Sequence, residues 1–436
     1  MPHGIPPASS DATPVSIYAC YASLRCMPTK TAKPPSALSI PGFRAFFLTY
    51  LFAMMADNTE HVISYYVAFH KFESTALAGF AVISHWVPFL LGSVAVGALN
   101  DRYDSRRLIQ CGMALFILAS AGWGYFFLTE SLEMWSACLL LVLHGTAGVL
   151  WQTSSQMLLY DIVGQDHLPS AVRLNATARY LGVLVGPAVG GGLLIALGPT
   201  VGIFVNTALY LPLLLWLVGA PYGRHFRAEA PMKRAVRGLA DIVQTLRDIR
   251  AVPVIGTMLV VGGGASFFIG NSYQASMPEF ARDLGHADGS VLYFMLLAAD
   301  AAGALLAGVL LEKTRSLLHV SPVNALRLSL VWAGALCGFA LVHSYPLALL
   351  LLFFAGFFEL SFSSMVQTIV QMNAPNEIRG RVLGLFNMAS LGLRAFSGIC
   401  VGMLGASISI HYSLALAAGA FFVVMLVLSL RPRASA

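Results

Sequence analysis

The chain has 436 residues, of which 57% are hydrophobic and only 11% are charged. Soluble domains carry about 25% charged residues, so the composition excludes an ordinary soluble protein and indicates an all-α polytopic membrane protein. The net charge of +6 does not indicate nucleic-acid binding, because the cations are separated by side of the predicted membrane. The six cysteines are scattered without metal-ligand spacing, so the sequence predicts no metal site and no disulfide framework.

Apolar runs fill most of the chain, and a helical crossing needs about 20 apolar residues. Residues 1–42 precede these runs and are rich in Pro, Ser, Ala and Thr, which predicts a disordered cytoplasmic tail. Twelve transmembrane helices are predicted, at 43–69, 76–99, 108–128, 133–161, 169–196, 200–220, 253–279, 289–311, 323–343, 346–371, 381–405 and 410–430. They form two similar six-helix halves, 43–220 and 253–430, with a basic linker at 221–252 and a cytoplasmic tail at 431–436.

The linker combines cations with a helical pattern of apolar residues. Val236, Leu239, Val243 and Leu246 recur at helical spacing opposite the cations. This pattern predicts an amphipathic helix on the cytoplasmic leaflet, or else a simple tether between the halves.

The cations also predict the orientation of the chain. With a cytoplasmic N-terminus, all Lys and Arg residues fall on the cytoplasmic side except Lys71, Arg282, Arg179 and Arg394, of which the last two lie within spans. Positive residues concentrate on the cytoplasmic side of membrane proteins. An even number of spans then places the C-terminus in the cytoplasm as well, and we expect the plasma (inner) membrane as the location.

A short charged segment separates the second span from the third. A glycine ends the apolar run, an acid follows four residues later, and cations come next; the same order recurs in the second half. The two copies comprise Gly97, Asp101, Arg102, Arg106 and Arg107, and Gly308, Glu312 and Lys313. Two copies about half a chain apart indicate an internal duplication.

The first copy resembles the Gly-x-x-x-Asp-Arg-x-Gly-Arg-Arg signature of the major facilitator superfamily. This resemblance implies twelve helices in two parallel repeats around a central substrate site. Two positions depart from the signature: Asp104 stands where the family often has glycine, and Ser105 displaces the basic pair by one residue.

The fifth span carries glycines at intervals of four, which share one helical face and allow another helix to pack closely. A proline within the run bends the helix. The residues are Gly182, Gly186, Pro187, Gly190 and Gly191. They resemble the Gly-x-x-x-Gly-Pro-x-x-Gly-Gly signature of the antiporter branches of the superfamily; the alternative is a packing motif that says nothing of transport direction.

The stretch from Glu377 to Val382 resembles the Glu-x-Arg-Gly-Arg-Val turn of exporters related to enterobactin and macrolide efflux proteins. The resemblance implies that Arg379 and Arg381 lie near Asp101 and help to hold the cytoplasmic ends together. The sequence itself shows only that the three residues lie on the predicted cytoplasmic side.

Ionisable residues inside spans are costly and usually face a cavity or a partner. The candidates for the substrate or proton pathway are Asp57, Glu60, His61, His144, Asp300, Glu359 and Arg394. A carboxyl group in a dry cavity can bind a proton near neutral pH, as proton coupling requires. The alternative is a neutralised pair, such as Glu359 with Arg394, that only fixes helix packing.

His144 stands four residues before Gly148 in the fourth span, where many drug–proton antiporters carry an arginine. A histidine there could titrate near neutral pH, or it could be a buried histidine with satisfied hydrogen bonds. In the seventh span, Gly262, Gly263 and Gly264 predict either close packing or local unwinding.

These observations predict a secondary transporter that works by alternating access and is not an enzyme. We expect a proton-coupled exporter of a small amphipathic molecule such as a siderophore or drug, acting as a monomer among membrane lipids without a cofactor. The chain has no Gly-x-x-x-x-Gly-Lys-Ser/Thr loop, which argues against ATP-driven pumping. An importer or lipid flippase on the same fold, and a non-transporting sensor or scaffold, are the alternatives.

Overall fold

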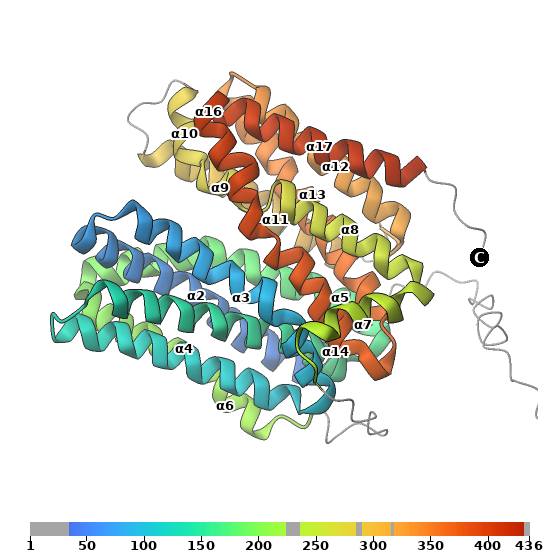
Figure 1. Cartoon of the computed structure of the whole chain (residues 1–436), viewed down its shortest axis with the longest axis horizontal. Helices are drawn as coiled ribbons and strands as arrows, with labels where there is room; N and C mark the ends of the chain where they lie inside the picture. Colours follow the sequence, from blue (N-terminus) through green and yellow to red (C-terminus); the bar gives the residue numbers. More distant parts are fainter. Residues whose placement is uncertain (1–34, 224–235, 285–289, 315–317, 431–436) are drawn as a thin grey trace, which may run out of the picture. The chain divides into compact units, whose positions relative to one another are not determined.

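The computed structural model describes residues 35–223, 236–284, 290–314 and 318–430, which are almost entirely helical (Figure 1). Most of the predicted N-terminal tail lies outside these residues. Its last part is ordered, because Ala37–Ser39 forms a short 3-10 helix, η2. Ala37 is fully buried and donates its N–H to Ser170 Oγ at 2.9 Å. Helical structure therefore begins before residue 43, where the first span was predicted to start.

The first part of the bundle consists of long helices. They are α2 (Pro41–Phe72), α3 (Thr75–Arg102), α4 (Ser105–Leu128), α5 (Met134–Leu209) and α6 (Leu211–Gly219). At 76 residues, α5 is far too long for one crossing, because 20 residues already span about 30 Å. Its backbone leaves helical geometry at Gly164 and Gly198, where φ is 67° and 73°. Both breaks fall between the spans predicted from the sequence.

The second part begins after a linker helix, α7 (Leu239–Asp248). Its helices are α8 (Pro253–Phe268), α9 (Ser272–Ala275), α10 (Met277–Asp283), α11 (Ser290–Thr314), α12 (Pro322–Leu341), α13 (Tyr345–Asn373), α14 (Arg379–Asn387), α15 (Arg394–Ser397), α16 (Leu404–Ile408) and α17 (Ile410–Leu430). Eight of the described helices are long and apolar enough to cross a membrane. The exact count of twelve spans stays a prediction.

Two predicted spans are less regular than expected. The seventh is interrupted after α8 at Gly270, where φ is 49° and a Cβ would overlap Ser397 Oγ. The eleventh contains two π-helical stretches, η6 (Met388–Gly392) and η7 (Gly398–Met403). Hydrophobic periodicity does not register such interruptions, because the apolar run continues through them.

The glycine triplet of the seventh span lies inside α8 and packs closely. A Cβ on Gly262, Gly263 or Gly264 would lie 3.2–3.3 Å from the side chains of the neighbouring helices. The unwound residue of this span is Gly270 instead. Of the two alternatives for the triplet, the structure therefore has close packing.

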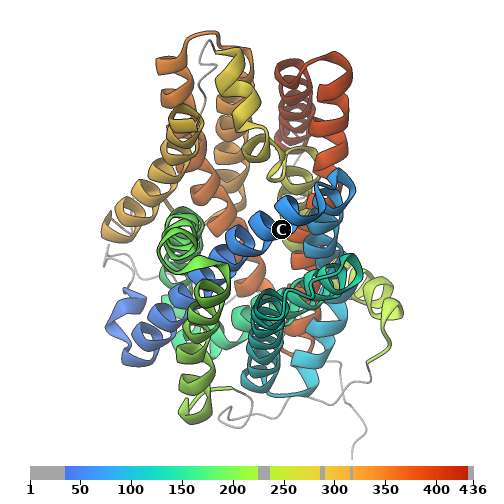
Figure 2. The same cartoon turned by 90° about the vertical axis from the view of Figure 1, so that its left-hand side faces the viewer.

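The hydrophobic core is divided along the sequence. One cluster of buried side chains comes from residues 249–425, apart from Val94 and Met157, and two others come from residues 37–217. Figure 2 shows the corresponding helices in two groups. We refer to residues 35–223 as the first half and residues 249–430 as the second half.

The linker helix α7 turns its polar edge towards the bundle. Asp241, Thr245 and Ile249 are buried, whereas Val243 and Leu246 are 52% and 45% exposed. The apolar edge found in the sequence is thus available to a lipid leaflet, and its contact with lipid stays a prediction. The linker cations before residue 236 lie outside the described residues.

The glycine face of the fifth span packs against α2. A Cβ on Gly182 would lie 2.7 Å from Met54 Cβ, and one on Gly186 would lie 2.5 Å from Asn58 Cβ. The hydroxyl of Thr59 donates to the Gly186 carbonyl at 3.1 Å. The seam therefore joins α2 to the second segment of α5 at a separation that only glycine permits.

Gly186→Ala should destabilise the protein by about 1–3 kcal/mol, the usual cost of overpacking a core. Gly191→Ala is the matched control, because nothing lies within 4 Å of its Cβ position and alanine is the better helix former by about 1 kcal/mol. Thermal unfolding of the purified variants should show a lower midpoint for the first and an unchanged or higher midpoint for the second. Equal midpoints would contradict this account of the seam.

Candidate functional site

A buried carboxylate joins the two halves at one end of the bundle. Asp101, in the last turn of α3, is 4% exposed. It accepts hydrogen bonds from Gly380 N at 2.6 Å, Arg381 N at 3.2 Å and Arg381 Nη1 at 2.9 Å. These N–H groups open α14, where the helix dipole favours an anion. A Cβ on Gly97 would overlap the Gly380 carbonyl, so the contact also depends on glycine.

Arg381 connects this contact to the linker. Its side chain is 1% exposed, and its Nε donates to Asp241 Oδ1 of α7 at 3.0 Å. Three segments far apart in the sequence, α3, α7 and α14, therefore meet around one guanidinium group. Figure 1 shows the ribbons of these helices at the same end of the bundle. Sequence reasoning missed Asp241; the available signal was an acid opposite the apolar residues of the linker, among its Glu229, Asp241 and Asp248.

The second copy of the charged motif makes a corresponding contact. Glu312, near the end of α11, accepts from Ser36 Oγ at 2.6 Å and Ser170 Oγ at 2.8 Å, and it pairs with Arg173 Nη2 at 3.3 Å. A Cβ on Gly308 would overlap the Thr177 hydroxyl. Each half thus contributes one acid that binds a helix of the other half.

The remaining motif residues lie apart from these two contacts. Arg102, Arg107 and Lys313 are exposed. Arg106 pairs with Asp104 at 2.8 Å and donates to the Ala220 carbonyl at 2.6 Å. Asp104 caps α4, which explains why an acid replaces the family's glycine at this position.

Arg379 does not reach Asp101 in the way that the resemblance implied. Its guanidinium lies over the ring of Tyr160, 3.6 Å from the ring centre, as in cation–π pairs. Of the two arginines in the turn, only Arg381 contacts the acid of the first motif.

A second group of ionisable residues is buried inside the first half. His144 lies between two carboxylates of α2, with Nδ1 2.8 Å from Glu60 Oε1 and Nε2 2.9 Å from Asp57 Oδ1. Tyr210 donates to Glu60 Oε2 at 3.3 Å. The rings of His61 and His85 are adjacent. The structure thus brings together all four first-half candidates of the sequence.

A third group is buried inside the second half. The Tyr273 hydroxyl lies 3.1 Å from Asp300 Oδ2 and 3.1 Å from Glu359 Oε2, and Gln274 Nε2 donates to Asp300 Oδ2 at 2.9 Å. The sequence analysis did not find Tyr273 and Gln274. They face the acids because the helix breaks before them, and the hydrophobic pattern of the seventh span gives no sign of that break.

The predicted pair between Glu359 and Arg394 is not formed among the described side chains. Arg394 instead lies over Trp86 of the first half, 5.0 Å from its ring centre. The arginine interacts with an aromatic ring across the two halves, so the neutralised pair suggested by the sequence is wrong.

A cavity of about 60 Å³ lies between the halves, and its charged lining residues are Arg179, Arg394 and Glu359. Water occupies cavities above about 15 Å³ when polar groups surround it, so this space can hold several waters. Its polar lining includes Gln156, Arg179, Glu359, Asn387 and Arg394. Gln156 donates to Asn387 Oδ1 at 2.8 Å across the halves.

Apolar helices that enclose a polar cavity, with an acid of each half bound to the other half, define a multi-pass membrane transporter of the major facilitator superfamily. The family model for transmembrane secretion effectors matches residues 32–434. The chain belongs to this family, which confirms the resemblance seen in the sequence. It is a transporter for small molecules and not an enzyme.

Two curated relatives carry functional names. The multidrug efflux pump Tap of Mycolicibacterium fortuitum is 24% identical over 349 residues, which cover 77% of this chain and 82% of the relative. The enterobactin exporter EntS of Shigella boydii serotype 4 (strain Sb227) is 24% identical over 373 residues, which cover 84% of this chain and 86% of the relative.

Solved structures agree in fold. The human organic anion transporter MFSD10 (TETRAN) superposes with a TM-score of 0.73 at 14% identity and covers 89% of this chain and 100% of its own. A variant of the Escherichia coli fucose:proton symporter FucP has a TM-score of 0.68 at 10% identity and covers 89% of this chain and 98% of its own. At these identities, the likeness shows the fold alone.

Asp101→Asn should loosen the contact between the halves, because removing one partner of a buried ion pair typically costs about 3–5 kcal/mol. Arg107 of α4 and Arg327 of α12 are exposed near this end. Spin labels on Arg107→Cys and Arg327→Cys, in a background without native cysteines, report their separation by pulsed electron resonance. We expect a new population at longer distance.

Asp104→Asn is the matched control, since Asp104 caps a helix of its own half and asparagine also caps well. It should leave the distance distribution as in the parent protein. A distribution that Asp101→Asn does not change would show that this carboxylate does not hold the halves together.

Proposed function

We propose that the protein exports small amphipathic organic molecules in exchange for protons by alternating access. The observation that carries proton coupling is the position of Tyr273 between two carboxyl groups. A phenol has one hydrogen to donate, although its oxygen can also accept. Both 3.1 Å contacts are hydrogen bonds only when Asp300 or Glu359 carries a proton, so the arrangement suits an exchangeable proton.

The position of these acids supports a link between protonation and substrate. Asp300 is 2% exposed, whereas Glu359 lines the cavity between the halves. Once the halves move apart and the cavity widens, a substrate in it would meet the Glu359 carboxyl directly and the Asp300 carboxyl through Tyr273. Charge on the acid pair and occupancy of the cavity would therefore influence one another, as coupled transport requires.

The cavity lining supports an amphipathic substrate with an anionic or aromatic part. Arg179 and Arg394 supply positive charge, and Trp332, Phe362 and Phe386 supply aromatic surface. Ligand sites commonly combine apolar walls with a few polar groups that fix orientation. The names of the two relatives, one for multidrug efflux and one for enterobactin, are consistent with such a substrate.

Export is supported by those names and by the glycine seam of the fifth span. We assign the end that carries Asp101, Glu312 and α7 to the cytoplasm, because the cations of the sequence gather there. Both termini would then be cytoplasmic, in the inner membrane of a bacterial cell. In the described state, the acid contacts between the halves would close the substrate site to the cytoplasm.

Proteoliposomes with an imposed pH gradient test this proposal. With acid inside, an antiporter should accumulate enterobactin or an amphipathic dye such as ethidium as protons leave, whereas a symporter should do so only with acid outside. Glu359→Gln and Asp300→Asn should lower the gradient-driven uptake at least tenfold, because an amide cannot release a proton. Glu130→Gln, on an exposed acid outside the site, should transport normally.

Substrate exchange without a gradient separates coupling from folding. The two carboxamide variants should still exchange labelled for unlabelled substrate at rates close to the parent. Uptake that ignores the direction of the pH gradient would refute proton antiport, and the absence of any transport across a broad substrate panel would favour a sensor or scaffold.

A further inference from the structure

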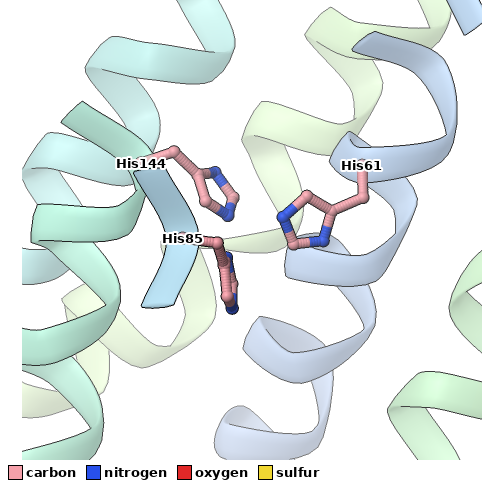
Figure 3. Close-up of side chains that lie close together, drawn as sticks. All are labelled: His61, His85 and His144. Carbon is pink, nitrogen blue, oxygen red and sulfur yellow. The ribbon is translucent and has the colours of Figure 1, made fainter. Parts of the chain in front are cut away.

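Three histidine rings from three different helices converge inside the first half (Figure 3). They belong to His61 of α2, His85 of α3 and His144 of α5, and one ring nitrogen of each lies within 4.8 Å of the others. The centre of the His61 ring lies 4.6 Å from the centre of the His144 ring and 5.0 Å from the centre of the His85 ring. The three residues are up to 83 positions apart in the chain, so only the fold assembles them.

Hydrogen bonding does not account for two of these histidines. Among the residues that the structure describes, neither His61 nor His85 has a hydrogen-bond partner, and the buried Nδ1 atom of His85 is unsatisfied. By contrast, His70 and His411 each contact a backbone carbonyl through Nδ1. Unpartnered buried polar groups are rare and indicate an unseen ligand, water or ion.

Two carboxylates complete the surroundings of the cluster. Asp57 lies 2.9 Å from His144 Nε2 and interacts electrostatically with all three histidines. Glu60 lies 2.8 Å from the other nitrogen of His144. A histidine that binds a metal usually donates its second N–H to a carboxylate, and Glu60 already occupies that place.

We propose that His61, His85, His144 and Asp57 form a binding site for a divalent transition-metal ion of the zinc class. Three imidazoles and one carboxylate suit Zn²⁺, Co²⁺ or Ni²⁺, whereas Ca²⁺ and Mg²⁺ prefer oxygen ligands alone. The ion would replace the proton of the hydrogen bond between His144 Nε2 and Asp57 Oδ1, which would be released to water, and Glu60 would orient the His144 ring. This site goes beyond transport and does not depend on the direction or coupling of transport.

The geometry requires only a modest closure. A tetrahedral ion with metal–nitrogen distances of about 2.0–2.1 Å holds its ligand atoms about 3.3 Å apart. The three histidine nitrogens lie up to 4.8 Å apart and must approach one another by about 1.5 Å, which rotation of the His61 and His85 side chains can supply. The contact of His144 Nε2 with Asp57 Oδ1, now 2.9 Å, must lengthen slightly. The His61 and His85 side chains are partly exposed, and only His144 is buried.

Binding of Co²⁺ to the full-length protein in nanodiscs tests the site, with an affinity tag that contains no histidine. Tetrahedral Co²⁺ absorbs strongly in the visible range, and Zn²⁺ should displace it from one site per chain. His61→Gln and His85→Gln should each weaken binding at least tenfold, and Glu60→Gln should weaken it about 10- to 100-fold as an outer partner. His70→Gln, on an exposed histidine of the same helix, is the matched control.

X-ray absorption of the Zn²⁺-loaded parent protein provides a test that needs no variant. We expect three imidazole nitrogens and one carboxylate oxygen around the ion. Sulfur ligands, a loss of binding in His70→Gln, or unchanged binding in both His61→Gln and His85→Gln would overturn the proposal. Because the assay measures binding alone, its failure would leave the proposed transport function untouched, and the reverse also holds.

Discussion

The structure depends most on a carboxylate that is buried where the two halves meet. Removing a carboxylate from water costs several kcal/mol unless its oxygens are satisfied. Asp101 receives two backbone N–H groups at a helix start and one guanidinium N–H. The guanidinium of Arg381 also forms an ion pair with Asp241. The carboxylate is thus satisfied only while α3 and α14 are together, and α7 in turn pairs with the guanidinium that binds it. Separating the halves would expose the carboxylate and the guanidinium at once.

Both copies of the charged motif connect the two halves, but they do so through different hydrogen-bond donors. Asp101 is almost inaccessible and faces a helix start, whereas Glu312 is partly exposed and is bound by the Ser36 and Ser170 hydroxyls and by Arg173. Hydroxyl donors and partial exposure cost less to separate than a buried ion pair. The first contact therefore holds the halves more firmly than the second, although the sequence motif is similar.

The sequence predicts those parts of the molecule that depend on neighbouring residues. The glycine face of the fifth span, the breaks near Gly164 and Gly198, and the acid of each motif follow from local spacing. Partners that come from distant elements could not be predicted in this way. Asp241 and Tyr273 acquire their roles only when the linker docks and the seventh span breaks. Arg394 lies over Trp86 of the other half and does not form an ion pair with Glu359.

The polar contacts fall into two classes with different consequences for alternating access. Bonds within one half, such as those of His144 with Asp57 and Glu60 or of Tyr273 with Asp300 and Glu359, can persist while the halves move as rigid bodies. Bonds between the halves, such as Asp101 with Arg381 and Gln156 with Asn387, must break and be replaced by water. In the proposed cycle the inter-half bonds would therefore contribute to the free-energy difference between conformations. The intra-half clusters would keep their geometry, so the proposed ion and proton sites would be the same whichever side of the cavity is open.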